Sequence, residues 1–225
     1  MSKTTDYTGH VDSGGDPAVR VLGDITVTKL SVGPMDNNAY VLTCAGTGSS
    51  LLIDAANDAE WIIGLLSSDP RHRSLASIVT THRHADHWQA LAEVVSSTGA
   101  PVLAGAEDAA GLPVPVDVPL RHGDTVPFGD CVLEVIALRG HTPGSVALLY
   151  REAGGGAHLF TGDSLFPGGP GRTTSPTDFT SLMDDLEARV FGLLPDDTWV
   201  YPGHGDDTTL GTERPHLPEW RARGW

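Results

Sequence analysis

The chain has 225 residues, and its 29 acidic and 14 basic side chains give a formal net charge of −15. Nucleic-acid binding draws on clustered Lys and Arg, so this charge argues against a nucleic-acid partner. No apolar run approaches the ~20 residues that span a bilayer, and no signal peptide is visible, so we expect a cytoplasmic protein without a membrane partner.

The composition shows no break along the chain, and a hydrophobic content of 40% suits one domain with its own core. We expect a loosely ordered, polar N-terminal arm over residues 1–20 and a single domain over residues 21–225. Cys44 and Cys131 form no CxxC pattern, so neither a disulfide framework nor a cysteine zinc site is predicted. Both are expected to pack in the core.

The first half of the chain alternates predicted strands with predicted helices. Strands are expected over residues 21–30, 39–43, 50–53, 75–80 and 101–104. Helices are expected over residues 59–66 and 88–99, with a helical turn at 107–110. The Pro-rich stretch over residues 112–119 is predicted to be an extended connector.

Strands dominate the second half. They are expected over residues 124–128, 131–138, 146–150, 158–160 and 198–201. Residues 167–178 are rich in Gly, Pro, Ser and Thr and are predicted to form a loop, followed by an amphipathic helix over residues 181–194. Strands interleaved with helices indicate an α/β layered fold, whose topology these patterns leave open.

Potential metal ligands follow the predicted strands. Four of them come directly after the strand over residues 75–80: His82, His84, Asp86 and His87. In extended chain the side-chain period is 2, so His82 and His84 point to the same side. Packing such groups together without a cation would crowd like charges or unpaired acceptors, so the stretch favours a metal site. Three later strands are followed by further candidates: His141, Asp163 and His204.

The segment THRHADH at residues 81–87 resembles the HxHxDH signature of the metallo-β-lactamase fold superfamily. Further motifs of that family appear in order: Gly140-His141-Thr142-Pro143-Gly144-Ser145, Thr161-Gly162-Asp163-Ser164-Leu165-Phe166 and Tyr201-Pro202-Gly203-His204-Gly205. The combination is most similar to small glyoxalase II-like (hydroxyacylglutathione hydrolase-like) enzymes. This resemblance implies a four-layer αββα sandwich in which helices flank two mixed β-sheets.

The resemblance also implies a centre of two divalent metal ions. One ion would be held by His82, His84 and His141, the second by Asp86, His87 and His204, with Asp163 bridging both. Asp54, at the end of a predicted strand, would orient the ligand loop from behind. Zinc is the metal we expect first, with iron or manganese as alternatives, because imidazole and carboxylate ligands suit all three.

The implied activity is hydrolysis of a hydroxyacyl thioester such as S-lactoylglutathione, or of a related small acyl-thiol, by a hydroxide formed at the metal pair. Asp86 and Asp163 are the catalytic candidates, with Asp86 placed to hold or shuttle the proton of the attacking water. Arg172, in a Gly-Arg-Thr loop, is a candidate contact for an anionic substrate group, and an exposed loop arginine is the alternative.

Two features of the sequence differ from known branches of the family. Asp163 stands where secreted metallo-β-lactamases commonly carry Cys, which argues against antibiotic degradation. Larger glyoxalase II proteins grip glutathione with a C-terminal helical region, whereas only 21 residues follow His204. The thiol carrier must therefore be held in another way or differ from glutathione.

Three alternatives share the motifs. Persulfide dioxygenases of this scaffold use one iron, which here would be held by His82 or its neighbour, His141 and Asp163. A lactonase would use the same hydroxide on a cyclic ester. A metal-stabilised binding protein is the non-enzymatic alternative, but structural zinc sites are normally closed four-ligand sets, often with Cys. The residues leave the oligomeric state open.

Overall fold

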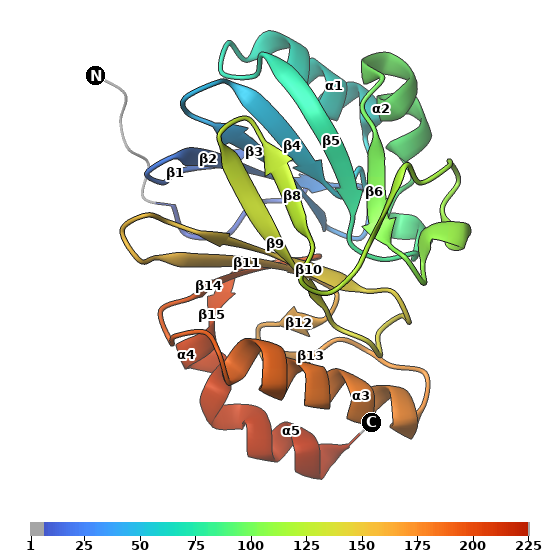
Figure 1. The fold of residues 1–225 in the computed structure, drawn as a ribbon, viewed down its shortest axis with the longest axis vertical. Coiled ribbons are helices and arrows are strands. Elements are labelled where there is room, and N and C mark those ends of the chain that lie inside the picture. The colour runs from blue at the N-terminus through green and yellow to red at the C-terminus, as the bar shows by residue number, and fades with distance from the viewer. Residues whose placement is uncertain (1–6, 225) are drawn as a thin grey trace.

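Two β-sheets packed face to face form the centre of the computed structural model, which describes residues 7–224 (Figure 1). The first, sheet A, runs in sequence order: β1 (Ala18–Val21), β2 (Ile25–Val32), β3 (Asn37–Cys44), β4 (Ser49–Ile53), β5 (Ser74–Thr80), β6 (Val102–Gly105) and β7 (Val118–Leu120). Its first four strands pair antiparallel and its last four pair parallel, so the sheet is mixed.

Sheet B contains the strands of the second half. Its order is β15 (Thr208–Thr209), β14 (Trp199–Pro202), β11 (Ala157–Gly162), β10 (Val146–Arg151), β9 (Cys131–Ala137) and β8 (Thr125–Phe128). Strands β11 and β14 pair parallel and the other neighbours antiparallel. A small hairpin of β12 (Leu165–Phe166) and β13 (Gly169–Pro170) follows β11.

Helices cover the outer face of each sheet (Figure 1). Sheet A carries α1 (Ala59–Ser68) and α2 (Leu91–Thr98), whereas sheet B carries α3 (Pro176–Leu186) and α5 (Leu217–Arg223), with the short α4 (Leu210–Glu213) before α5. Three separate apolar clusters fill the spaces between the four layers. The αββα sandwich of two mixed sheets implied by the sequence motifs is therefore confirmed.

Alternating side chains explain why sheet A is buried on both sides. In β2, Ile25 and Val27 enter the cluster between the sheets, whereas Leu30 and Val32 enter the cluster under α1 and α2. A strand buried on both faces has an almost continuously apolar sequence. Strand β2 departs from this pattern, because the polar side chains of Thr28, Lys29 and Ser31 are buried as well.

Three local expectations differ from the structure. Residues 1–6 of the expected N-terminal arm lie outside the described residues, but residues 18–21 form β1, and the ring of Tyr7 packs 6.0 Å from that of Trp199. Helix α3 begins at Pro176, inside the expected loop, because the Ser175 hydroxyl accepts from the amide of Asp178 and Pro is favourable at the first helical position. Helices α4 and α5 were not expected.

The remaining differences are small. A 3₁₀ turn at Ala85–His87 separates β5 from α2, so the helix expected from residue 88 begins at Leu91. The expected helix over residues 181–194 ends as a π-helical turn at Glu187–Phe191. Within residues 7–224, none of the helices has the length and apolar content that crossing a bilayer requires.

Candidate metal centre

The sheets deliver the seven predicted ligands to one place. His82 and His84 lie just beyond β5, and Asp86 and His87 lie on the 3₁₀ turn that follows. The other three lie in loops after β9, β11 and β14: His141, Asp163 and His204. Each loop begins at the carboxyl end of its strand, where sites in α/β sheets usually lie.

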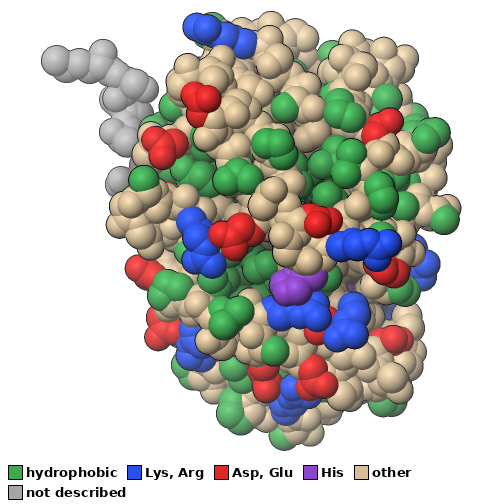
Figure 2. Space-filling view, viewed as in Figure 1, with side chains coloured by type: hydrophobic (Ala, Val, Ile, Leu, Met, Phe, Trp, Pro, Cys, Tyr) green, Lys and Arg blue, Asp and Glu red, His purple; other side chains and the backbone are tan. Residues whose placement is uncertain are grey.

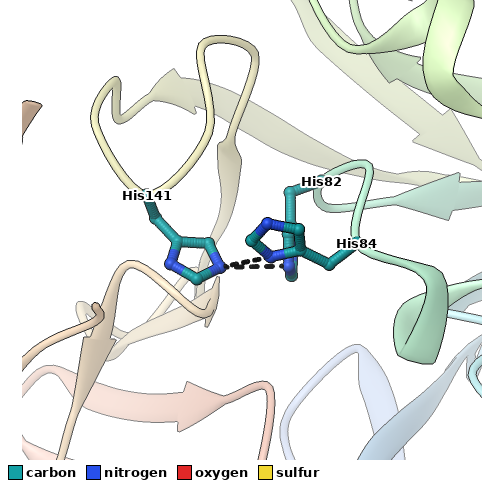
Figure 3. Close-up of side chains that lie close together, drawn as sticks. All are labelled: His82, His84 and His141. Carbon is teal, nitrogen blue, oxygen red and sulfur yellow. Dashed lines mark hydrogen bonds between the residues drawn. The ribbon is translucent and has the colours of Figure 1, made fainter. Parts of the chain in front are cut away.

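The first group of ligands consists of three histidines (Figure 3). His141 Nε2 lies 3.2 Å from His82 Nε2 and 2.9 Å from His84 Nδ1. His82 is buried and His84 is exposed, so the group opens to solvent on one side. These three nitrogen atoms lie within 4.8 Å of one another, close enough to bind one cation.

The second group lies beside the first. His87 Nε2 is 3.2 Å from His204 Nε2, and Asp86 Oδ2 is 3.3 Å from His204 Nε2 and 3.5 Å from His87 Nε2. Asp86 and His204 are partly exposed, whereas His87 is fully buried. This group could hold a second cation.

Asp163 lies between the two groups. Its Oδ1 is 3.2 Å from His87 Nε2, and its Oδ2 is 3.6 Å from both His141 Nε2 and His204 Nε2. Oδ1 is buried, and it has no hydrogen-bond partner of good geometry among the described residues. A buried carboxylate oxygen without a donor is costly, which fits a position that a cation satisfies.

In three of the imidazoles, the nitrogen that faces away from the cluster already makes a hydrogen bond. His141 Nδ1 donates to the carbonyl of Arg172 at 2.6 Å, His87 Nδ1 to Asp54 Oδ2 at 2.9 Å, and His204 Nδ1 to the carbonyl of Met35 at 2.9 Å. A neutral imidazole has one N–H, so the Nε2 atoms of these three side chains carry lone pairs. Lone pairs about 3 Å apart repel each other. A cation bound between the nitrogen atoms would remove this repulsion, because it would accept both lone pairs.

Asp54 fixes the ligand loop from behind. Its carboxylate accepts from the amide and the hydroxyl of Thr81, both at 2.7 Å, as well as from His87. Thr81 has donated its hydroxyl proton, so its oxygen accepts from His82 Nδ1 at 3.1 Å, which leaves His82 Nε2 bare as well. Asp54 adopts a left-handed backbone conformation with φ of 57°, a strained state for a non-glycine residue.

The electrostatics of the cluster suit cation binding. Burial lowers the pKa of His82 and His141, which therefore remain neutral ligands. Burial also opposes protonation of His87, but the carboxylates of Asp163 and Asp54 raise its pKa to about 10, so its Nε2 binds a proton unless a metal cation takes that position. Burial favours the neutral form of Asp163, yet the imidazoles of His204 and His87 that face it hold its pKa well below the usual range.

Two supporting residues have no sequence signal that singles them out. Asp108 is fully buried and accepts from the amides of Arg83 and Gly144, at 3.0 and 2.9 Å, and from the hydroxyl of Thr142. It thereby ties the loop of His82 and His84 to the loop of His141. Asn37 Nδ2 donates to Asp86 Oδ2 at 3.0 Å.

Arg172 contributes in two ways. Its carbonyl orients His141, a role that the sequence motif did not indicate. Its exposed guanidinium lines a surface cavity of about 310 Å³ together with Phe179 and Arg223 of α5. Lys and Arg side chains gather beside a histidine on one face of this acidic protein (Figure 2).

Comparisons with known proteins identify the family. The family model described as "Metallo-beta-lactamase superfamily" matches residues 32–204. A hydroxyacylglutathione hydrolase from Fuscovulum blasticum is 38% identical over 171 residues, covering 75% of this chain and 62% of that relative. The chain thus spans less than two thirds of the length of that relative.

Two solved structures share the fold. ETHE1 from Myxococcus xanthus superposes with a TM-score of 0.75 at 30% identity, covering 85% of this chain and 83% of that one. The TTHA1623 protein, solved in a di-iron-bound form, gives a TM-score of 0.69 at 31% identity and covers 85% and 99% of the two chains. With its αββα sandwich and its His and Asp cluster at the strand ends, the chain belongs to the metallo-beta-lactamase superfamily.

Proposed function

We propose that the chain is a dinuclear metal-dependent hydrolase that cleaves a hydroxyacyl thioester of the S-lactoylglutathione type or a related small acyl-thiol. The observation that carries the proposal is the convergence of bare Nε2 atoms and an unsatisfied carboxylate oxygen on one point. The relatives named hydroxyacylglutathione hydrolase support the substrate class.

His82, His84 and His141 would hold one divalent ion, and Asp86, His87 and His204 the other, with Asp163 shared between them. Zinc is the first expectation, and iron or manganese would suit the same donors. The di-iron-bound relative supports a centre of two ions. When bound, two such ions lower the pKa of a water molecule and polarise a carbonyl group.

The residues of the chain complete the chemistry. Asp86 is partly exposed, and Asn37 holds one of its oxygens, so its carboxylate is positioned to receive a proton from the attacking water. As the carbon–sulfur bond breaks, the same proton can pass to the leaving thiolate. Thr81, Asp54 and Asp108 keep the ligand loops in place during this cycle.

The cavity beside the centre supports an anionic substrate. Its lining residue Gly171 packs so closely on Asp163 that an added Cβ would lie 1.7 Å from the Asp163 carbonyl oxygen, and the next residue, Arg172, orients His141. The guanidinium groups of Arg172 and Arg223 would bind carboxylate groups of a thiol carrier, and Phe179 would contact its apolar part.

A mononuclear iron persulfide dioxygenase is the second candidate. His82 Nε2, His141 Nε2 and Asp163 Oδ2 lie within 4.0 Å of one another, a two-histidine, one-carboxylate set that suits a single iron. The likeness to ETHE1 supports this candidate, whereas the four further donors favour the hydrolase.

The two candidates differ in metal content and in co-substrate. We would purify the full chain, count metals per chain, and measure thiol release from S-lactoylglutathione beside oxygen uptake with glutathione persulfide. Two metals per chain with thiol release is the expected result. One iron with persulfide-dependent oxygen uptake would establish the second candidate, release of acid from a lactone alone would make the protein a lactonase, and inertness would favour a binding protein.

A further inference from the structure

The two cysteines of the chain meet across the sandwich. Cys44 ends β3 of sheet A and Cys131 begins β9 of sheet B, and the two thiols are neighbours in the cluster between the sheets. Both are free and buried, with 2% and 7% of their surface exposed. Both belong to the apolar cluster between the sheets, as the sequence predicts, and there they face each other from different sheets.

A surface cavity gives small molecules access to this pair. Both cysteines line a cavity of about 450 Å³, together with Asp24, Asp130 and Arg151. Among the described residues, none of those lining this cavity belongs to the candidate metal centre. The cavity is therefore separate from the metal centre.

The environments of the two sulfur atoms differ. Cys131 Sγ–H donates to the carbonyl of Asp24 at 3.5 Å, and its burial raises the pKa of its thiol to about 12. Burial would also raise the pKa of Cys44, but hydrogen bonds from Thr47 and from the backbone of Asp130, together with the neighbouring Cys131 thiol, lower it to about 7. A thiol with a pKa near the ambient pH is the most effective attacking group in thiol–disulfide exchange.

We propose that Cys44 and Cys131 form a redox-active dithiol site that reduces small disulfides and closes into an intramolecular disulfide. The Cys44 thiolate attacks one sulfur of the small disulfide, so a bond to Cys44 forms and one thiolate leaves. The Cys131 sulfur then attacks Cys44, and the second thiolate leaves. The two leaving groups take up the two protons of the cysteines, so one small disulfide becomes two thiols.

Glutathione disulfide is the probe for the test. The full chain is incubated with an excess of it at pH 7, quenched with acid, and measured by intact mass and peptide mapping. We expect a loss of two hydrogens per chain and one peptide pair that links Cys44 to Cys131. The product should revert with dithiothreitol, and its rate of formation should not depend on protein concentration. Stable glutathione adducts on both cysteines, a link between two chains, or no reaction would overturn the proposal.

Two variants test the order of the steps. Cys131→Ser should stop at a glutathione adduct on Cys44. Cys44→Ser should react at least about tenfold more slowly, because its remaining thiol, Cys131, is largely protonated. Equal reaction of both variants would overturn the assignment of Cys44 as the attacking residue. The product formed by the unsubstituted chain decides the proposal even if a variant does not fold.

Discussion

At the scale of single residues, the centre depends on outer hydrogen bonds as much as on the ligands. If the N–H of a ligand imidazole were on the nitrogen facing the cation, that nitrogen could not bind it. Outer acceptors hold the N–H on the other nitrogen: the carbonyls of Arg172 and Met35 and the carboxylate of Asp54. The strained backbone of Asp54 serves the same arrangement, because it lets one carboxylate reach both Thr81 and His87. The residues around the cluster therefore select one tautomer per ligand.

Asp163→Asn tests the shared ligand. The amide keeps the shape of the side chain but removes the negative charge that both cation positions use, so we expect loss of bound metal and a fall in thiol release of more than about 100-fold. Metal analysis and kinetics measure the two effects. Glu213→Gln is the matched control, since this buried carboxylate accepts from Gly168 and Thr208 instead. A variant that retains both metals and near-normal turnover would contradict the bridging role.

Asp108→Asn tests the link between two ligand loops. Asparagine replaces one acceptor oxygen by a donor, so the bond to either Arg83 or Gly144 is lost. We expect a weaker affinity for metal at the three-histidine group by about 10–100-fold. Competition with a chelator measures this affinity. Asp117→Asn, which changes a similar bond to the amide of Val102, should leave it unchanged.

Arg172→Met tests the anionic substrate. A hydrogen bond to a charged group contributes roughly 1.5–3 kcal/mol, so we expect KM for S-lactoylglutathione to rise about 10-fold or more. The same acyl group on a neutral carrier, N-acetylcysteamine, serves as the control and should show an unchanged KM. The carbonyl that orients His141 remains in the variant, so an equal loss with both carriers would contradict a contact between the guanidinium and the substrate.

At the scale of elements, β2 and the N-terminal segment hold the loop of His204. Lys29 Nζ, on β2, donates to Asp207 Oδ1 at 2.6 Å and to the carbonyls of Gly9 and Gly205, each at 2.7 Å. Both charged side chains are fully buried. Burial lowers the pKa of Lys29 and raises that of Asp207, so each charge depends on the other.

Lys29→Met should therefore destabilise the fold strongly. Removing one partner of a buried ion pair leaves an uncompensated charge, which typically lowers the free energy of unfolding by about 3–5 kcal/mol. Chemical denaturation of the metal-free protein measures this value. The double variant Lys29→Met/Asp207→Asn removes the remaining charge and should be more stable than the single variant. If the double variant loses as much or more, the destabilisation does not come from the unpaired carboxylate.

Sequence patterns predict the elements that depend on residues close together in the chain. Apolar strands followed at once by His or Asp mark the ligand loops, and the structure brings all seven predicted ligands together. The start of α3 was missed because a Ser-Pro cap was interpreted as loop composition. Asp108, Lys29 and the contact between Cys44 and Cys131 depend on packing between segments distant in the chain, which no local pattern encodes.

At the scale of the whole molecule, the fold buries two histidines that do not belong to the metal centre. His72 and His158 have side chains only 3% and 4% exposed. The first bonds to Thr43 and Ser50, and the second to Tyr201 and Glu152. Burial lowers the pKa of both imidazoles; Asp69 and Glu152 act against this effect, and Arg71 and Arg20 add to it. The folded protein thus keeps both histidines neutral where the unfolded chain would protonate them.

This difference predicts that the free energy of unfolding decreases as the pH is lowered. Below the ordinary histidine pKa of about 6.5, the unfolded chain binds protons at these two histidines and the folded chain does not. The free energy of unfolding therefore decreases by up to about 1.4 kcal/mol per pH unit and per histidine. The decrease continues down to the lowered pKa of the folded state, and above about pH 7.5 these two groups have no effect.

Urea denaturation between pH 7.5 and 5 tests this. The free energy of unfolding of His158→Gln should change less steeply with pH than that of the unsubstituted protein, whereas His216→Gln, at an exposed position, should behave like the unsubstituted protein. The metal centre is the same in all three proteins, so its own pH dependence cancels in the comparison. Equal slopes for His158→Gln and the unsubstituted protein would mean that this buried imidazole does not set the acid sensitivity.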